Sequence, residues 1–152
     1  MIHSNAGRKI LTLQPPGVNR LPVNIQELVD VLVCVATALR DLHSLMLCHT
    51  DLRWSNVVRV LENVWYLIDC TNFVRVGVNA SSEDMTFASS RYRTEYRLNE
   101  FPYSIKHDLY QVGKLAECCG NLLDDGLDAL ISMCLNGAYG NTNDLLQHLL
   151  AR

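Results

Sequence analysis

Two carboxylates and one carboxamide stand at positions that suit phosphoryl transfer. Asp51 and Asn56 share a polar loop after a long apolar stretch, and Asp69 follows a second apolar run. Carboxylate and amide oxygens are ligands that Mg²⁺ accepts beside water and substrate phosphates, and a positioned carboxylate takes up the proton of a hydroxyl group. We therefore predict that Asn56 and Asp69 bind Mg²⁺ and that Asp51 acts as the base. Arg53, in the same loop, would steady the transferred phosphate.

A β-hairpin is expected between this loop and Asp69. Two runs rich in β-branched and aromatic residues, Val57–Val60 and Val64–Ile68, are separated by a short polar turn. A hairpin brings its two ends together, so Asn56 and Asp69 should lie side by side at one end of it.

Helices are expected to make up most of the remaining chain. Asn24 followed by Glu27 has the pattern of a capping box, and apolar residues recur at helical spacing from Ile25 to Leu47. Three further helices are predicted at about residues 104–120, 126–135 and 142–151, the first capped by Ser104 and ended by Gly120. The expected fold is mainly α, of the α+β class, with a short hairpin that carries the active-site loops.

The motifs resemble those of the protein kinase superfamily. The catalytic loop H-R-D-L-x-x-x-N is matched by His49, Asp51 and Asn56. Asp69 matches the metal-binding Asp of D-F-G. Farther on, Tyr92–Glu95 is similar to a degraded A-P-E segment, and Lys106–Gly113 resembles the start of the central buried helix of kinases. The small, polar residues 77–90 stand where kinases have an activation loop.

The resemblance implies cofactors and supporting residues. ATP and Mg²⁺ would be the cofactors, and the phosphoryl group would pass to Ser or Thr of a protein. By analogy with kinases, His49 and Asp108 would support the catalytic loop, His49 by packing and Asp108 by accepting hydrogen bonds from the loop backbone. Glu95 would be a third supporting residue. Thr50 replaces the usual Arg of the loop, and Cys70 and Thr71 replace the Phe-Gly after the metal-binding Asp.

Only the C-terminal lobe of a kinase has a counterpart here. The chain is expected to be a single partial domain, with a hinge strand at about residues 9–13 and the lobe at about residues 24–151. The Gly-rich phosphate loop and the strand Lys of kinases have no match, so the N-terminal lobe is expected to be absent and the residues that bind ATP are unknown. We expect the isolated chain to be incomplete or inactive, and a protein substrate or partner to cover the open cleft.

Three functions are compatible with these residues. The chain is either part of an active Ser/Thr-type protein kinase, or a pseudokinase-type binding module, or a relative of small-molecule phosphotransferases. Aminoglycoside and choline phosphotransferases also have an H-x-D-x-x-x-x-N loop followed by Ile-Asp. The segments Tyr92–Glu95 and Asp108–Gly113 favour the protein kinase branch.

The composition of the chain argues against several other classes of protein. A net charge of −3 gives no electrostatic footprint for nucleic acid. The longest apolar stretch, Leu28–Leu47, is interrupted by charged residues, so we expect no membrane span, and no secretory signal precedes it. The six cysteines lack C-x-x-C spacing. They are expected to be reduced thiols of an intracellular protein, either cytoplasmic or nuclear.

Overall fold

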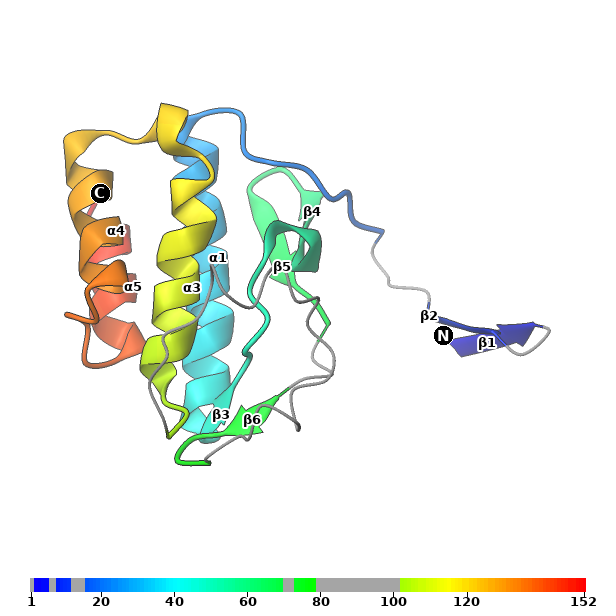
Figure 1. Ribbon diagram of the computed structural model, residues 1–152. Coiled ribbons are helices and arrows are strands. Elements are labelled where there is room, and N and C mark those ends of the chain that lie inside the picture. Colours follow the sequence, from blue (N-terminus) through cyan, green and yellow to red (C-terminus); the bar gives the residue numbers. More distant parts are fainter. Residues whose placement is uncertain (1, 6–7, 12–15, 70–72, 79–101) are drawn as a thin grey trace.

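The computed structural model of the chain describes residues 2–5, 8–11, 16–69, 73–78 and 102–152 (Figure 1). In these ranges the chain forms four α-helices and three two-stranded antiparallel sheets. The α+β class predicted from the sequence is therefore correct. Some predictions fall outside the described residues: those for Cys70 and Thr71, most of the polar loop 77–90, and Tyr92–Glu95.

The helices form one side of the molecule, and the hairpin of residues 57–67 lies on the other (Figure 1). Their bounds are Ile25–Ser44 for α1, Ile105–Glu117 for α3, Asp125–Leu135 for α4 and Thr142–Leu150 for α5. The sheets pair β1 (Ile2–Asn5) with β2 (Arg8–Leu11), β3 (Leu47–Cys48) with β6 (Val74–Arg75), and β4 (Val57–Leu61) with β5 (Val64–Leu67). None of the helices in the described ranges combines the length and hydropathy that crossing a membrane requires.

Most predicted elements are present, with shifted ends. The helix predicted to reach Leu47 ends at Ser44, and Leu47 starts strand β3. The helix predicted to stop at Gly120 ends at Glu117, and Gly120 begins a separate 3₁₀ turn, Gly120–Leu122. Of the expected hinge strand, residues 9–11 belong to β2, which pairs with β1. Residues 12 and 13 are not described.

Helix α1 is the centre of the core. Six of its apolar side chains are buried, and they face α3, α5 and the β4–β5 hairpin: Leu28, Val31, Leu32, Val35, Ala36 and Leu39. Burying a valine or leucine side chain stabilises a fold by about 1.5–3 kcal/mol. Because one helix contacts all these elements, its position fixes the hairpin relative to the helical side.

The N-terminal cap of α1 differs from the predicted capping box. The Oδ1 of Asn24 accepts the backbone N–H of Glu27 at 2.9 Å, as expected. Glu27, however, accepts the N–H of Val23 at 3.1 Å and pairs with the Arg20 guanidinium through both carboxylate oxygens, at 2.6 and 2.8 Å. The second half of the predicted box is therefore wrong, because a bidentate, charge-assisted pair with arginine is stronger than one bond to a neutral N–H.

The segment before α1 is fastened to the hairpin. Val18 and Arg59 exchange two backbone hydrogen bonds, at 2.8 and 2.9 Å. The side chain of Asn19 donates to the carbonyls of Trp54 and Val57, the latter at 3.0 Å. The guanidinium of Arg20 lies over the ring of Trp65, 5.2 Å from its centroid. These contacts hold residues 18–20 beside the loop that contains Asp51.

Gly113 allows α3 and α4 to approach each other. A Cβ at this position would lie 2.8 Å from Cδ2 of Leu135 and 3.2 Å from Cβ of Cys134. Overpacking of this kind costs about 1–3 kcal/mol, whereas alanine gains at most about 1 kcal/mol in helix propensity. We expect Gly113→Ala to lower the free energy of unfolding by about 1 kcal/mol, measured by urea denaturation. The control Gly120→Ala, with no atom within 4 Å of the new Cβ, should not be destabilised; equal losses would contradict the packing argument.

The pairing of Glu27 should make stability depend on pH in acid. Hydrogen bonds from Arg20 lower the pKa of Glu27 to about 2, whereas a free glutamate titrates near pH 4.3. The stabilisation is therefore complete above about pH 5 and is lost as pH falls towards 2. Glu27→Gln should cost about 1 kcal/mol at pH 7, the usual upper limit for such a partly exposed pair, and much less near pH 2. Glu62→Gln, in the exposed turn, is the control; a Glu27→Gln loss independent of pH would refute the assignment.

Candidate active site

The loop that contains Asp51 rests on α3 through one buried carboxylate. The side chain of Asp108, in the first turn of α3, is fully buried. Its Oδ2 accepts the backbone N–H of His49 at 2.7 Å and its Oδ1 that of Thr50 at 2.9 Å. Nε2 of His43, near the end of α1, lies 2.9 Å from Oδ2. The backbone contacts are those expected of Asp108 from the kinase resemblance.

Two further side chains hold the loop, and the sequence analysis missed both. Gln111, one turn after Asp108, donates through Nε2 to the carbonyl of Thr50 at 3.0 Å and accepts the N–H of Leu52 at 2.9 Å. The indole N–H of Trp54 donates to the carbonyl of Leu115 at 3.0 Å. Residues three apart share a helix face, so the spacing from Asp108 to Gln111 was the available signal for the first contact.

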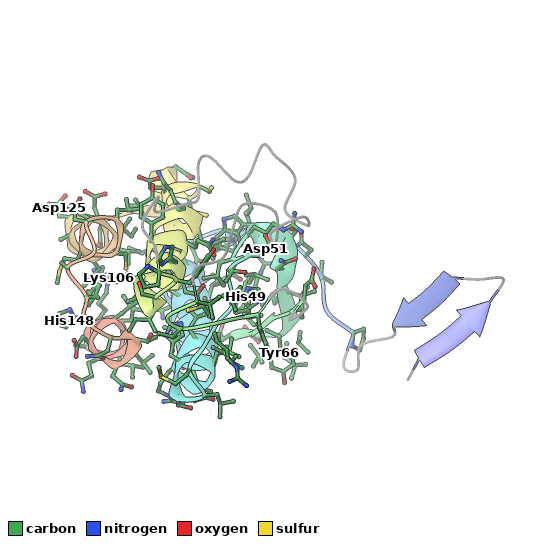
Figure 2. The ribbon with its side chains drawn as sticks, turned by 60° about the horizontal axis from the view of Figure 1, so that its bottom comes forward. His49, Asp51, Tyr66, Lys106, Asp125 and His148 are labelled. Atoms are coloured by element: carbon green, nitrogen blue, oxygen red, sulfur yellow. The ribbon has the colours of Figure 1, made fainter. Side chains whose placement is uncertain are left out.

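His49 is buried under the loop. Figure 2 shows it close to Asp51, whose backbone N–H donates to Nδ1 of His49 at 3.3 Å. The ring meets Phe73 edge to face, with centroids 5.7 Å apart. Burial lowers the pKa of His49, and the opposing effects of Asp108, the Ile68 backbone, Asp51 and Asp69 only partly offset it. A neutral, enclosed imidazole suits the supporting role expected of His49 better than proton transfer.

The carboxylate of Asp51 is held by its own loop. Nδ2 of Asn56 donates to Oδ2 of Asp51 at 3.0 Å and to the Asp51 carbonyl at 2.9 Å. Nε of Arg53 lies 3.2 Å from the same Oδ2. Asp51 is 8% exposed, so its carboxylate is largely shielded from water and fixed in direction. Asn56 and Arg53 both contact Oδ2, which leaves Oδ1 as the oxygen that a hydroxyl group would approach.

The hairpin brings Asp69 to the same end as Asn56. Val57 pairs with Leu67 at the start of the β4–β5 ladder, and the N–H of Ile68 donates to the carbonyl of Asn56 at 2.8 Å. Asp69, the next residue, is exposed. The adjacency predicted from the two β-rich runs is therefore present in the structure.

Two residues of the site have left-handed backbones. Thr50 has φ of 68° and Asp69 has φ of 64°. This region costs L-residues about 1–2 kcal/mol, and for a β-branched residue such as Thr50 it is a clear outlier. Strain of this kind gathers at functional sites, where the surrounding structure imposes it.

The residues at the hairpin end fit a hard cation. Asn56 donates to Asp51 through its nitrogen, so its Oδ1 is the atom that a cation would meet. The exposed carboxylate of Asp69 supplies a second oxygen. Carboxylate and amide oxygens that leave room for water are a ligand set that Mg²⁺ accepts. Glu95, the third predicted supporting residue, lies outside the described residues.

A second group of ligand-type side chains lies beneath the loop. Ligand atoms of His43, Cys48 and Asp108 lie within 4.8 Å of one another. Both oxygens of Asp108, however, accept backbone N–H groups of the loop, and burial, reinforced by Asp108, raises the pKa of Cys48 to about 12. Asp108 and His43 therefore act as a hydrogen-bonded support of the loop. The five described cysteines are all free.

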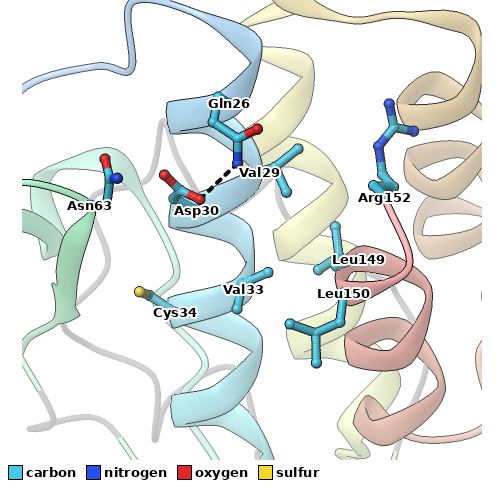
Figure 3. Close-up of a pocket in the computed structure, with 9 residues that line it drawn as sticks. All are labelled: Gln26, Val29, Asp30, Val33, Cys34, Asn63, Leu149, Leu150 and Arg152. Carbon is cyan, nitrogen blue, oxygen red and sulfur yellow. Dashed lines mark hydrogen bonds between the residues drawn. The ribbon is translucent and has the colours of Figure 1, made fainter.

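A shallow groove lies away from the loop, across α1 and the end of α5. Its volume is about 260 Å³, and its apolar lining includes Val29, Val33, Leu149 and Leu150 (Figure 3). Gln26 donates to Asp30 at 3.0 Å along its edge. None of the predicted catalytic or metal-binding residues lines this groove.

Comparisons with known proteins give a partial likeness. No protein family model matches the chain. A stretch of 60 residues is 43% identical to Crinkler effector protein 8 of Phytophthora infestans. That stretch makes up 39% of this chain and 10% of that protein, so the match spans only a small part of the relative's length.

The stability of the loop should depend on the charge of Asp108. Asparagine has almost the same shape, but it has one acceptor oxygen where aspartate has two, so one of the two backbone N–H groups would face an amide nitrogen that cannot accept it. Leaving a buried donor without its partner costs about 1–3 kcal/mol, and more beside charged groups. We expect Asp108→Asn to lower the free energy of unfolding by about 3 kcal/mol, measured by urea denaturation. Asp125→Asn, exposed in the first turn of α4, should change it by less than about 0.5 kcal/mol; similar losses for the two variants would refute the role of Asp108.

Proposed function

We propose that the chain acts as the large lobe of a protein kinase-like phosphotransferase, which passes the terminal phosphoryl group of Mg-ATP to Ser or Thr of a protein. One observation carries this proposal. A shielded carboxylate, a carboxamide and an exposed carboxylate, of Asp51, Asn56 and Asp69, are grouped by a loop and a hairpin that α3 supports through Asp108.

Each residue has a role that its contacts support. Oδ1 of Asp51 accepts the proton of the attacking hydroxyl, while Asn56 and Arg53 fix Oδ2 and so aim the carboxylate. Asn56 and Asp69 would hold Mg²⁺, which would neutralise charge on the phosphates. Arg53, with its side chain 30% exposed, is close enough to the base to steady the transferred group as well.

Catalysis in this proposal needs a second phosphate-binding surface. The 152 residues contain no Gly-rich loop of the kinase type and no strand Lys matching that of kinases. Positioning and charge stabilisation supply most of the rate of phosphoryl transfer, so the lobe alone would transfer phosphate slowly or not at all. The likeness to one tenth of a larger effector protein fits a lobe that works within longer polypeptides.

Binding without catalysis is a second candidate function, as in a pseudokinase. Large apolar side chains are exposed on the segment before α1 and at the tip of the hairpin: Val18 is 64%, Val23 69% and Leu61 63% exposed. A protein partner that covers Val18 would lie beside Arg59 of the hairpin, with which Val18 pairs. This candidate predicts association without phosphate transfer, which the following experiment separates from the first.

Transfer of labelled phosphate from ATP tests the proposal. The assay uses the longest natural polypeptide that contains this chain, with Mg²⁺ and a panel of protein and small-molecule acceptors. Losing the base or a metal ligand should reduce kcat by about 10²–10⁴-fold, so we expect this loss for Asp51→Asn and Asp69→Asn. Asp69→Asn should also raise the Mg²⁺ concentration needed for half-maximal rate, whereas Asp51→Asn should not.

Asp125→Asn, exposed on α4, controls for a general loss of charge and should keep full activity. Undiminished transfer by Asp51→Asn would reject the assignment of the base. A wild-type polypeptide that transfers no phosphate to any acceptor would favour the binding module, and transfer to small molecules alone would favour the small-molecule branch.

A further inference from the structure

The direction of Asp51 depends on the backbone of the residue before it. Thr50 has φ of 68°, in the left-handed region that its β-branched side chain disfavours. If Thr50 relaxed to an ordinary conformation, the chain direction at Asp51 would turn and its carboxylate would leave Asn56. A residue in such a conformation stays there only when its neighbours impose it.

Asp108 and Gln111 hold different parts of this turn. Asp108 accepts the N–H groups of His49 and Thr50. These belong to the two peptide groups before the Cα of Thr50, the atom at which the strained backbone angles lie. Gln111 contacts the next two peptide groups, through the carbonyl of Thr50 at 3.0 Å and the N–H of Leu52 at 2.9 Å. Its carboxamide therefore spans Asp51, with one hydrogen bond on each side of it.

We propose that Gln111 is a positioning residue for Asp51, which keeps Thr50 left-handed and thereby aims the carboxylate at the reacting hydroxyl. The catalytic part of this inference rests on the proposed function. Gln111 is 4% exposed and Leu52 1% exposed, so water cannot readily replace these hydrogen bonds. The orientation of the carboxamide is fixed, because the Leu52 amide can only donate and the Thr50 carbonyl can only accept.

A double-mutant cycle with Thr50→Gly tests the inference through catalysis. Gln111→Met keeps the length of the side chain and removes both hydrogen bonds, which should lower kcat by about 10- to 100-fold with a smaller change in KM for ATP. Glycine adopts positive φ without strain, so the same substitution should cost at least about threefold less in the Thr50→Gly background. Gln147→Met, exposed on α5, should leave kcat unchanged. An equal loss in both backgrounds would show that Gln111 does not act through Thr50.

Amide hydrogen exchange of the 152-residue chain tests the same contact without catalysis. Gln111→Met should speed exchange at Leu52 by about tenfold or more, while the amides of His49 and Thr50, held by Asp108, keep their protection. Unchanged exchange at Leu52 would overturn the inference, whatever the activity. Faster exchange at Leu52, together with no phosphate transfer by the longest natural polypeptide that contains the chain, would reject the proposed function and leave the positioning contact standing. If Gln111→Met does not fold, Gln111→Glu serves instead, since it keeps the acceptor for Leu52 and sets an oxygen against the Thr50 carbonyl. The Gln111→Glu variant should keep exchange at the Leu52 amide slow and still lower kcat. A normal kcat would contradict the inference.

Discussion

Asp108 carries a carboxylate with no exposed surface, and the surrounding structure has to satisfy it. A buried charge is tolerated only with well-placed donors, and two come from the backbone of the loop, at His49 and Thr50. His43 lies against the same carboxylate and, through its other ring nitrogen, 2.6 Å from the hydroxyl of Thr142 at the start of α5. One side chain of α3 therefore links the loop, the end of α1 and the start of α5.

The apolar core and the hydrogen bonds around Asp108 stabilise different features of the structure. Packing around α1 sets where the hairpin stands, but apolar contacts are not directional and would tolerate small rotations of the loop. Hydrogen bonds from Asp108 and Gln111 to individual peptide groups are directional. They fix the backbone on both sides of Asp51, so a site that requires a defined carboxylate direction depends on α3 more than on the strands that flank it.

Local signals in the sequence predicted much of this arrangement. The Asn24 cap and the hairpin arise from neighbouring residues, and the hairpin alone was enough to place Asp69 beside Asn56. Two side-chain pairings were missed. Nothing near Glu27 shows that its carboxylate will pair with Arg20 instead of completing the capping box. Likewise, nothing near Thr50 shows that Gln111 will hold its carbonyl. The bond between Asp108 and the loop was expected only through the resemblance to kinases, since no local pattern joins residues so far apart.

Asn19 ties the incoming chain to the carbonyls of Trp54 and Val57, on either side of Asn56. Residues 18 and 19 therefore lie next to the loop that contains Asp51. Any group joined to the chain just before these residues would be held close to that loop by a short linker. A short tether keeps its cargo at an effective concentration in the millimolar range. Even a weak association with the loop would then be intramolecular, and it would not depend on how much of the protein is present.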